Sequence, residues 1–381
     1  MLTEHLAPLF NPIRLRGLEL PNRIQMAPMT RSFCDEAGVP TPQVAAYYTR
    51  RAQAGLIVTE GTVVNMAEAR GYLGIPGLCT DAQEAGWRAV TEAVHGAGGR
   101  ISVQLWHCGP LCHSRATGGV LPQAPSGVTP QGAYVDALDP STYDGHLSYE
   151  VPRAMTSADI DRVVGEFAAA ARRAVRAGFD AIDIHGAHGY LLSAFMNPDS
   201  NRRADRYGGS VANRARLAVE IVAAVRESIP DGMPLEIRLS QHAVNDYDAI
   251  TWPTPDDYAT VLGLLEDAGA DVIHASANRL GQPGFSGQDG SLARWTRQLC
   301  GLKVVAVGGI THSTTIGESF GGTDTAVTDP AEAAAAIDAQ ECDMVSVGRA
   351  MIANPDWMEK VTAGHWQTLR PFAPVMLGEL N

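Results

Sequence analysis

Short runs of apolar residues alternate with longer segments of helical periodicity along most of the chain. The apolar runs have the length of buried strands, and the segments between them repeat apolar residues at intervals of three and four. The eight predicted strands cover residues 23–28, 56–61, 101–106, 181–186, 235–240, 272–276, 304–309 and 344–349. The predicted helices include residues 42–54, 81–97, 157–177, 212–229, 255–268 and 330–339. This alternation favours parallel strands covered by helices.

The segment SADIDRVVGEFAAAARRAVRAGF carries the most complete helix pattern. Ser157 offers a hydroxyl that can cap its first turn, and Gly178 can end it. Eight strand–helix units predict an α/β fold, the (β/α)8 TIM barrel. A doubly wound sheet is the alternative, disfavoured because no GxGxxG motif follows the first strand. No linker divides the chain, so we expect residues 1–381 to form one domain.

One segment interrupts the alternation. Residues 107–156 are rich in glycine, proline and serine and separate the third strand from its helix. Structureless excursions of this length are uncommon and often act as lids or binding loops, so we predict a lid here. The segment begins with HCGPLCH, which holds four potential metal ligands in seven residues. Their spacing matches no common zinc motif, which favours an ordinary loop over a metal site.

Composition narrows the class of protein. The 381 residues are 45% apolar, enough for a large core, and 29 basic against 42 acidic residues give a net charge of −13. That charge disfavours nucleic-acid binding. No apolar run approaches the roughly 20 residues that span a bilayer, and the start MLTEHLAPLFNPIRLRG lacks the apolar core of a secretory signal. The six cysteines are scattered, without a CxxC pair. We therefore expect a cytoplasmic protein with free thiols and no membrane partner.

Hydrogen-bonding side chains and glycines gather where the predicted strands end. In a TIM barrel, the carboxyl ends of the strands form the mouth that carries the active site. The residues of this kind are Thr30, Gly61, Gln104, His185, His188, Tyr190, Arg238, Ser276, Asn278, Gly308, Gly309, Gly348 and Arg349. A random set of polar residues would fall at both ends of the strands. We therefore expect one site at this mouth.

The last two strands end in VGGI and VGRA, which indicate a phosphate site. Glycine lets the backbone approach an anion, and Arg349 adds a forked cationic partner, although tight strand–helix packing would also select glycine. A phosphate ligand that also reaches Gln104 and Arg238 must be long and planar, which suits flavin mononucleotide (FMN). A non-redox lyase or isomerase that grips phosphate with Arg349 is the alternative. It is disfavoured because none of the eight predicted strands contains a Schiff-base lysine.

Several stretches resemble the Old Yellow Enzyme family of FMN-dependent NAD(P)H oxidoreductases. They are LFNPIRLRGLELPNRIQMAPMTRS, YYTRRAQAGLIVTEGT, HGAGGRISVQLWH, FDAIDIHGAHGYLLSAFMNPDSNRRADRYGGSVANRAR and DMVSVGRAMIANPDW. The resemblance covers nearly the whole chain, and the combination of HGAHGYL with NRR-D-YGGS is its most specific part. It implies a TIM barrel that binds FMN noncovalently and takes electrons from NADH or NADPH. No cysteine cluster follows the barrel, so the nicotinamide is expected to reduce the flavin directly.

The resemblance also assigns cofactor contacts. It implies that the segment 27–30 lines the flavin, that Gln104 contacts its pyrimidine edge, and that Arg238 faces its N1–C2 region. The phosphate end is expected at the last two strands. The full set of expected cofactor contacts is Ala27, Pro28, Met29, Thr30, Gly61, Gln104, Arg238, Gly308, Gly309, Gly348 and Arg349.

The resemblance further implies an ene-reductase reaction on a small electrophilic alkene. His185 and His188 would hydrogen-bond the oxygen of the activating group, Tyr190 would protonate the α carbon, and Tyr72 would contact the substrate. Tyr72 lies among glycines, where an aromatic residue is as often a packing residue. A metal held by the HxxH pair is disfavoured because no third ligand stands nearby. A flavoprotein without reductase turnover stays open as an alternative, as does a homodimer, which is common in the family.

Overall fold

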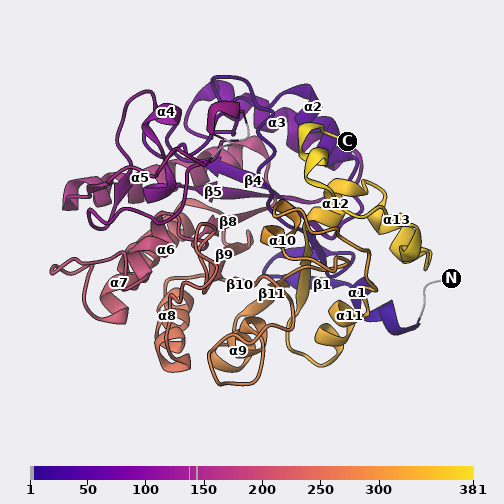
Figure 1. Ribbon diagram of the computed structural model, residues 1–381. Helices are drawn as coiled ribbons and strands as arrows, with labels where there is room; N and C mark the ends of the chain where they lie inside the picture. The colour runs from indigo at the N-terminus through magenta and orange to yellow at the C-terminus, as the bar shows by residue number, and fades with distance from the viewer. Residues whose placement is uncertain (1–3, 137, 143–144) are drawn as a thin grey trace.

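The computed structural model describes residues 4–136, 138–142 and 145–381. Eight parallel strands close into a barrel in the order β10-β11-β12-β3-β4-β5-β8-β9 (Figure 1). They are β3 (Ile24–Met26), β4 (Leu56–Val63), β5 (Ile101–Trp106), β8 (Ala181–His185), β9 (Leu235–Ser240), β10 (Val272–Ser276), β11 (Lys303–Val307) and β12 (Met344–Val347). The TIM barrel prediction is confirmed, and the doubly wound alternative is wrong because the sheet closes on itself.

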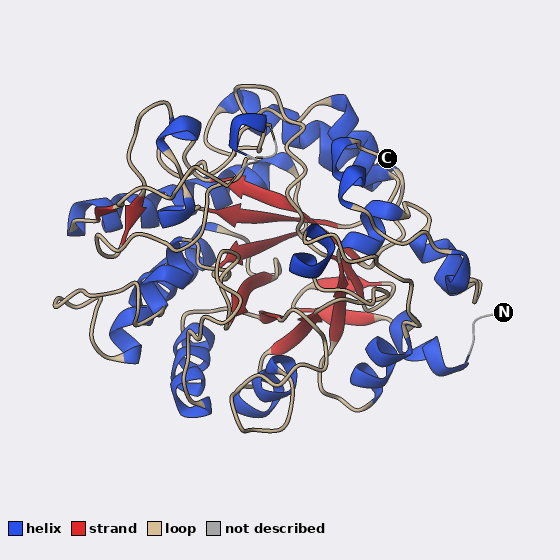
Figure 2. Cartoon of the chain, in the orientation of Figure 1, coloured by secondary structure: helices blue, strands red, loops and turns tan. Residues whose placement is uncertain are grey.

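Helices surround the barrel (Figure 2). The longer ones are α2 (Pro42–Thr49), α3 (Asp81–Gly96), α5 (Ser157–Ala177), α7 (Val211–Ser228), α8 (Pro255–Asp267), α9 (Leu292–Leu299) and α11 (Ala331–Asp338). Shorter α-helices are α1 (Ala7–Phe10), α4 (Ser114–Thr117), α6 (Leu191–Met196), α10 (Ile316–Phe320), α12 (Arg349–Ala353) and α13 (Trp357–Thr362). The 3₁₀ helices are η1 (Glu4–Leu6), η2 (Gly109–Leu111), η3 (Pro140–Thr142), η4 (Trp366–Thr368) and η5 (Pro374–Gly378). The six predicted helices are all present, and the ones not predicted are eight residues or shorter, too short for a clear helical period.

A hairpin that the sequence did not predict covers one end of the barrel. It consists of β1 (Ile13–Leu15) and β2 (Leu18–Leu20), paired antiparallel. Its apolar side chains form a buried cluster with Leu56, Val272, Val305 and Met344, which lie at or near the start of their strands. The amino-terminal end of the barrel is therefore filled, and the carboxyl ends of the strands form the free mouth.

The excursion after β5 is folded, which corrects the expectation of a structureless segment. Besides η2, α4 and η3 it holds two short strands, β6 (Gln123–Ala124) and β7 (Arg153–Ala154), which pair in parallel. Its residues 137, 143 and 144 lie outside the described residues. Its aromatic and sulfur side chains pack against the mouth in a buried cluster that includes Trp106, Cys108, Cys112, Tyr134, Tyr149 and Tyr190. This packing places the excursion over one side of the mouth, where a lid would lie.

The HCGPLCH motif does not gather its ligands. His107 Nδ1 accepts a hydrogen bond from Gly109 N at 3.0 Å, and His113 Nδ1 lies 3.7 Å from Glu150 Oε2. Cys108 and Cys112 are buried free thiols. Within the described ranges, the one group of three side chains with metal-ligand spacing is Asp183, Glu236 and His274, elsewhere in the barrel. In the same ranges no helix is long and apolar enough to cross a membrane.

Helix α5 has the predicted bounds, but its capping residue differs from the prediction by one position. Thr156, rather than Ser157, is the N-cap: its side chain accepts a hydrogen bond from Asp159 N, and the Asp159 carboxylate accepts one from Thr156 N. This reciprocal pair is a capping box, and it explains why Ser157 is already the first helical residue. At the other end Gly178, with φ of 88°, ends the helix as predicted.

Replacing the cap tests this assignment. We expect Thr156→Ala to lower the free energy of unfolding by about 1 kcal/mol, because the N–H of Asp159 loses its acceptor. Ser157→Ala, one residue along, is the matched control and should change stability by less than about half that amount. Urea unfolding followed by circular dichroism measures both. Equal losses in the two variants would contradict the assignment.

Candidate active site

A cavity opens at the free mouth, and nearly all the predicted site residues line it. Those are Pro28, Met29, Thr30, Gly61, Gln104, His185, His188, Tyr190, Arg238, Gly308, Gly309, Gly348 and Arg349. Two are not brought to the cavity wall: Ala27 is buried behind Gly348, and Tyr72 lies behind Tyr190. The wall also holds residues for which the sequence analysis proposed no role, among them His242, Tyr247, His312 and Ser346. His242, Tyr247 and His312 lie two or more residues beyond a strand end, where strand periodicity carries no information about direction.

The protonation of His185 can be read from its neighbours. Its Nδ1 accepts a hydrogen bond from Ala187 N at 3.3 Å, which leaves the proton of the neutral ring on Nε2. Burial, helped by the positive charge of Arg238, holds the pKa of His185 well below its usual value. The imidazole is therefore neutral at neutral pH. It offers one N–H, on the side opposite the backbone.

The ring of His188 is held by Ser276, at the end of β10. Its Nε2 lies 2.8 Å from Ser276 Oγ, and Arg238 donates to the same oxygen at 3.3 Å. Burial and the charge of Arg238 also lower the pKa of His188 well below its usual value, so this ring is neutral as well. The two imidazoles meet edge to face, with ring centres 5.3 Å apart. A ligand oxygen that uses Nε2 of His188 must take the place of the serine.

Tyr190 places a phenol beside the ring of His185. Its ring lies 5.0 Å from that of His185 and edge-on to Trp106 at 4.7 Å. Its hydroxyl is 3.2 Å from that of Tyr72, which stacks on Trp106. Burial raises the pKa of Tyr190 above its usual value, so the phenol keeps its proton at neutral pH. Tyr72 thus contacts Tyr190, and its predicted contact with a substrate stays a prediction.

The glycines of the last two strands differ in what they do. A Cβ on Gly308 would lie 2.6 Å from the backbone of Arg279, so packing alone requires glycine there. A Cβ on Gly348 would meet nothing closer than Met29 Sδ at 3.4 Å. The open space beside Gly348 is therefore available to a ligand. This distinction supports an anion site at Gly348 more than at Gly308.

Arg349 and His312 complete this end of the cavity. The Arg349 guanidinium donates to Thr315 O at 3.0 Å and to Ser319 Oγ at 2.6 Å, which fixes its direction. Within the described part of the chain, both ring nitrogens of His312, Arg238 Nε and Ser346 Oγ are buried without a hydrogen-bond partner. All three residues line the cavity. Buried polar atoms normally find partners, so this wall is suited to a polar, negatively charged ligand.

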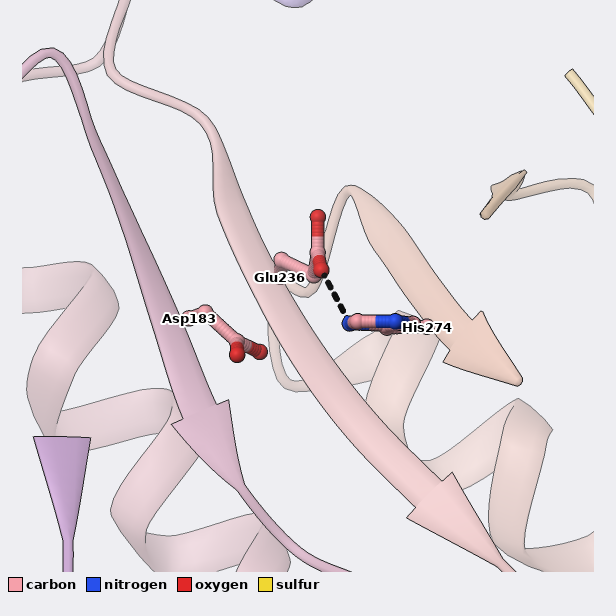
Figure 3. A group of neighbouring side chains, drawn as sticks. All are labelled: Asp183, Glu236 and His274. Carbon is pink, nitrogen blue, oxygen red and sulfur yellow. Dashed lines mark ion pairs between the residues drawn. The ribbon is translucent and has the colours of Figure 1, made fainter. Parts of the chain in front are cut away.

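A group of buried ionisable side chains lies inside the barrel below the cavity. Asp183, Glu236 and His274 come from three adjacent strands and point toward one another (Figure 3). Glu236 Oε1 lies 2.9 Å from His274 Nδ1. Their ligand atoms lie within 4.8 Å of one another, yet Arg238 follows two residues after Glu236 and already supplies a positive charge to both carboxylates. We therefore interpret the group as a support beneath the cavity wall and not as a metal site.

Glu60 supports the wall from behind. It is buried next to Gly61, and its Oε2 accepts hydrogen bonds from Arg31 N at 2.8 Å and Ser32 N at 3.1 Å. These bonds hold the turn that follows Thr30. Burial raises the pKa of Glu60 from 4.5 to about 7, and the two N–H donors oppose that rise. The carboxyl thus gains protons when the chain folds near neutral pH.

Comparison with known proteins agrees with this geometry. A model of the NADH:flavin oxidoreductase / NADH oxidase family matches residues 8–367. The chain is 43% identical over 229 residues to flavin oxidoreductase hxnT of Emericella nidulans, covering 59% of this chain and 57% of that protein. It is 33% identical over 367 residues to 12-oxophytodienoate reductase 7 of Oryza sativa subsp. japonica, covering 93% and 87%. The structure superposes on an old yellow enzyme homologue from Zymomonas mobilis with a TM-score of 0.81 and 31% identity, covering 97% and 96%.

The raised pKa of Glu60 gives a pH prediction. Because the folded-state pKa lies above the unfolded value, the stabilising contribution is complete below pH 4.5 and is lost as the pH rises through about 7. In the wild-type protein this loss lowers the free energy of unfolding by up to about 3 kcal/mol across that interval, at about 1.4 kcal/mol per pKa unit. We expect the Glu60→Gln variant, which lacks the titrating carboxyl, not to show this decline. Chemical denaturation at several pH values measures the decline.

Glu359→Gln, an exposed position on α13, is the matched control for loss of one carboxylate. A Glu60→Gln variant whose pH dependence equals that of the wild type would rule out the assignment.

Proposed function

The chain belongs to the NADH:flavin oxidoreductase / NADH oxidase family, and from that premise we propose that it is an FMN-dependent ene-reductase driven by reduced nicotinamide. Its substrates would be small alkenes activated by a carbonyl or a similar group. The observation that carries the proposal is the meeting of two neutral imidazoles and one protonated phenol in the same cavity as an anion-binding wall. A relative that matches over 93% of this chain is named 12-oxophytodienoate reductase 7, a name that agrees with this chemistry.

The cavity fits FMN on several counts. Gly348, Arg349 and the unpartnered ring of His312 would hold the phosphate, and Gln104 and Arg238 would hold the polar edge of the ring system. When bound, FMN supplies two-electron chemistry, taking electrons from reduced nicotinamide and passing them to an activated alkene. Arg238 keeps its positive charge, since burial lowers its pKa only to about 10. It would stabilise negative charge on the nearby ring edge.

The remaining side chains would act on the substrate. Nε2–H of His185 would donate to the oxygen of the activating group, and His188 would join it by exchanging its Ser276 partner. Neutral donors in a buried cavity stabilise an oxygen that gains negative charge as the double bond is reduced. Tyr190 would then give its proton to the α carbon. A phenol with a raised pKa is a weak acid in water but suffices toward an enolate.

The non-redox alternative finds no support at the mouth. Strand β11 begins one residue earlier than predicted and therefore includes a lysine, Lys303. Its Nζ pairs with Asp343 Oδ1 at 2.9 Å, at the end of the barrel opposite the cavity. A Schiff-base lyase would need that amine among the residues that line the cavity. Family membership points the same way, toward redox chemistry.

A spectrum of the purified protein tests the proposal. We expect a yellow protein whose flavin absorption bleaches under anaerobic NADH or NADPH and returns on addition of cyclohexenone. Bleaching without return would favour a flavoprotein that lacks reductase turnover. A colourless protein that FMN cannot reconstitute would refute the proposal altogether.

Tyr190→Phe separates the two half-reactions. We expect reoxidation by cyclohexenone to slow roughly a hundredfold, because the α carbon loses its proton donor, while reduction by nicotinamide changes by less than about threefold. Stopped-flow absorbance of the flavin follows each half-reaction separately. Equal slowing of both would contradict the acid role of Tyr190.

His185→Ala should weaken binding of a phenolate ligand about tenfold or more, because the oxygen loses a buried N–H donor. The long-wavelength charge-transfer band that a bound phenol induces in the flavin provides the titration. His365→Ala removes an exposed imidazole and is the matched control. If the two variants titrate alike, His185 does not bind the ligand oxygen.

A further inference from the structure

The amide of Gln104 is held from below by an acid that the cavity does not reach. Gln104 lines the cavity, and its Nε2 donates to Asp183 Oδ2 at 2.7 Å on the neighbouring strand. Asp183 is fully buried and absent from the cavity wall. With one amide N–H engaged by the acid, the amide oxygen is left as an acceptor for a ligand.

Asp183 lies among other buried polar side chains, and the bond from Gln104 is the side-chain hydrogen bond that it makes within the described residues. Glu236 and His274 lie beside it on the next two strands (Figure 3). Gln25 Nε2 donates to Glu236 Oε1 at 3.1 Å. Burial and the charge of Glu236 raise the pKa of Asp183, while Arg238 and the bond from Gln104 lower it. In either protonation state one carboxyl oxygen keeps a lone pair for the amide N–H. An acceptor for the bond observed from Gln104 Nε2 is therefore available whether or not the acid is charged.

We propose that Asp183 is a positioning residue that turns the Gln104 amide oxygen toward the cavity, so that the site selects a heterocycle with an N–H on its polar edge. A free amide can present either its oxygen or its NH2 group, and the two ends recognise opposite partners. With the nitrogen fixed by Asp183, the cavity offers an acceptor from Gln104 beside the donors of Arg238. An imide edge, with an N–H next to a carbonyl oxygen, matches this pair.

The inference rests on the proposed function, because FMN carries such an imide edge at N3–H. It adds that the preference for this edge originates in Asp183, an acid that contacts Gln104 and does not line the cavity. A positioning role and a merely structural role for Asp183 predict different results. A structural residue would change flavin affinity in general, whereas a positioning residue changes the affinity ratio between two flavins that differ only at N3.

The test compares FMN with N3-methyl-FMN on the full-length apoprotein, with flavin fluorescence as the readout of each Kd. The methyl group removes the N3 donor, and its steric cost is common to all variants. We expect Asp183→Leu to lower the wild-type preference for FMN about fivefold, the factor that one hydrogen bond is worth. Gln104→Leu should give the same reduced ratio. Asp183→Asn, whose amide oxygen can still accept from Gln104, should keep the ratio within about twofold of wild type.

Asp183→Ala is measured beside Asp183→Leu, and circular dichroism checks that each variant is folded. A wild-type ratio in either folded variant, with FMN still bound, would overturn the positioning role and leave the proposed function intact. Failure of the wild-type protein to bind either flavin would instead remove the proposed function, and this inference with it.

Discussion

The pairing of the last barrel strand with the first is the interaction on which the site depends. Val345 of β12 lies opposite Ile24 of β3, and this parallel register closes the sheet. Gly348 and Arg349, near the end of the chain, thereby come to lie beside Met29 near its start. An open sheet would leave Gly348 and Arg349 at one edge and the 28–30 turn at the other. Closure also fixes the direction of the site, because the β1–β2 hairpin fills the opposite end.

Burial around one permanent cation sets the protonation states at the mouth. Arg238 stays charged in the barrel, and its field, added to desolvation, keeps both His185 and His188 neutral. The same low-dielectric surroundings keep the proton on Tyr190. A site with two imidazolium ions next to Arg238 would be costly, since like charges at short range repel strongly where water is excluded. Neutral donors around one cation are the arrangement that this burial allows.

Much of the fold and of the candidate site could be predicted from the sequence, because the barrel topology brings the carboxyl ends of all strands together at one mouth. Once eight strands were assigned, Gln104, His185, Arg238 and Gly348 had to face one mouth. The buried group of Asp183, Glu236 and His274 inside the barrel was not predicted. Each lies within a predicted strand, and the sequence around each gives no sign that neighbouring strands bring the three together. Tyr72 was placed near the substrate, but its position behind Tyr190 depends on how the 107–156 segment packs. His312 follows a left-handed residue, Thr311 with φ of 60°, so its direction could not be read from strand periodicity.

Two side chains at the mouth follow the same structural principle. Each uses one polar atom to bind the protein and leaves another for the cavity: His185 bonds Ala187 through Nδ1, and Gln104 bonds Asp183 through Nε2. The inner bond fixes the tautomer or the amide orientation before any ligand arrives, so that binding does not have to reorganise these groups. Apolar residues beneath the mouth would pack as well but could not orient a dipole. The polar barrel interior is therefore the support that gives the cavity its directional hydrogen bonds, and loss of one inner acceptor should be felt as loss of selectivity before loss of fold.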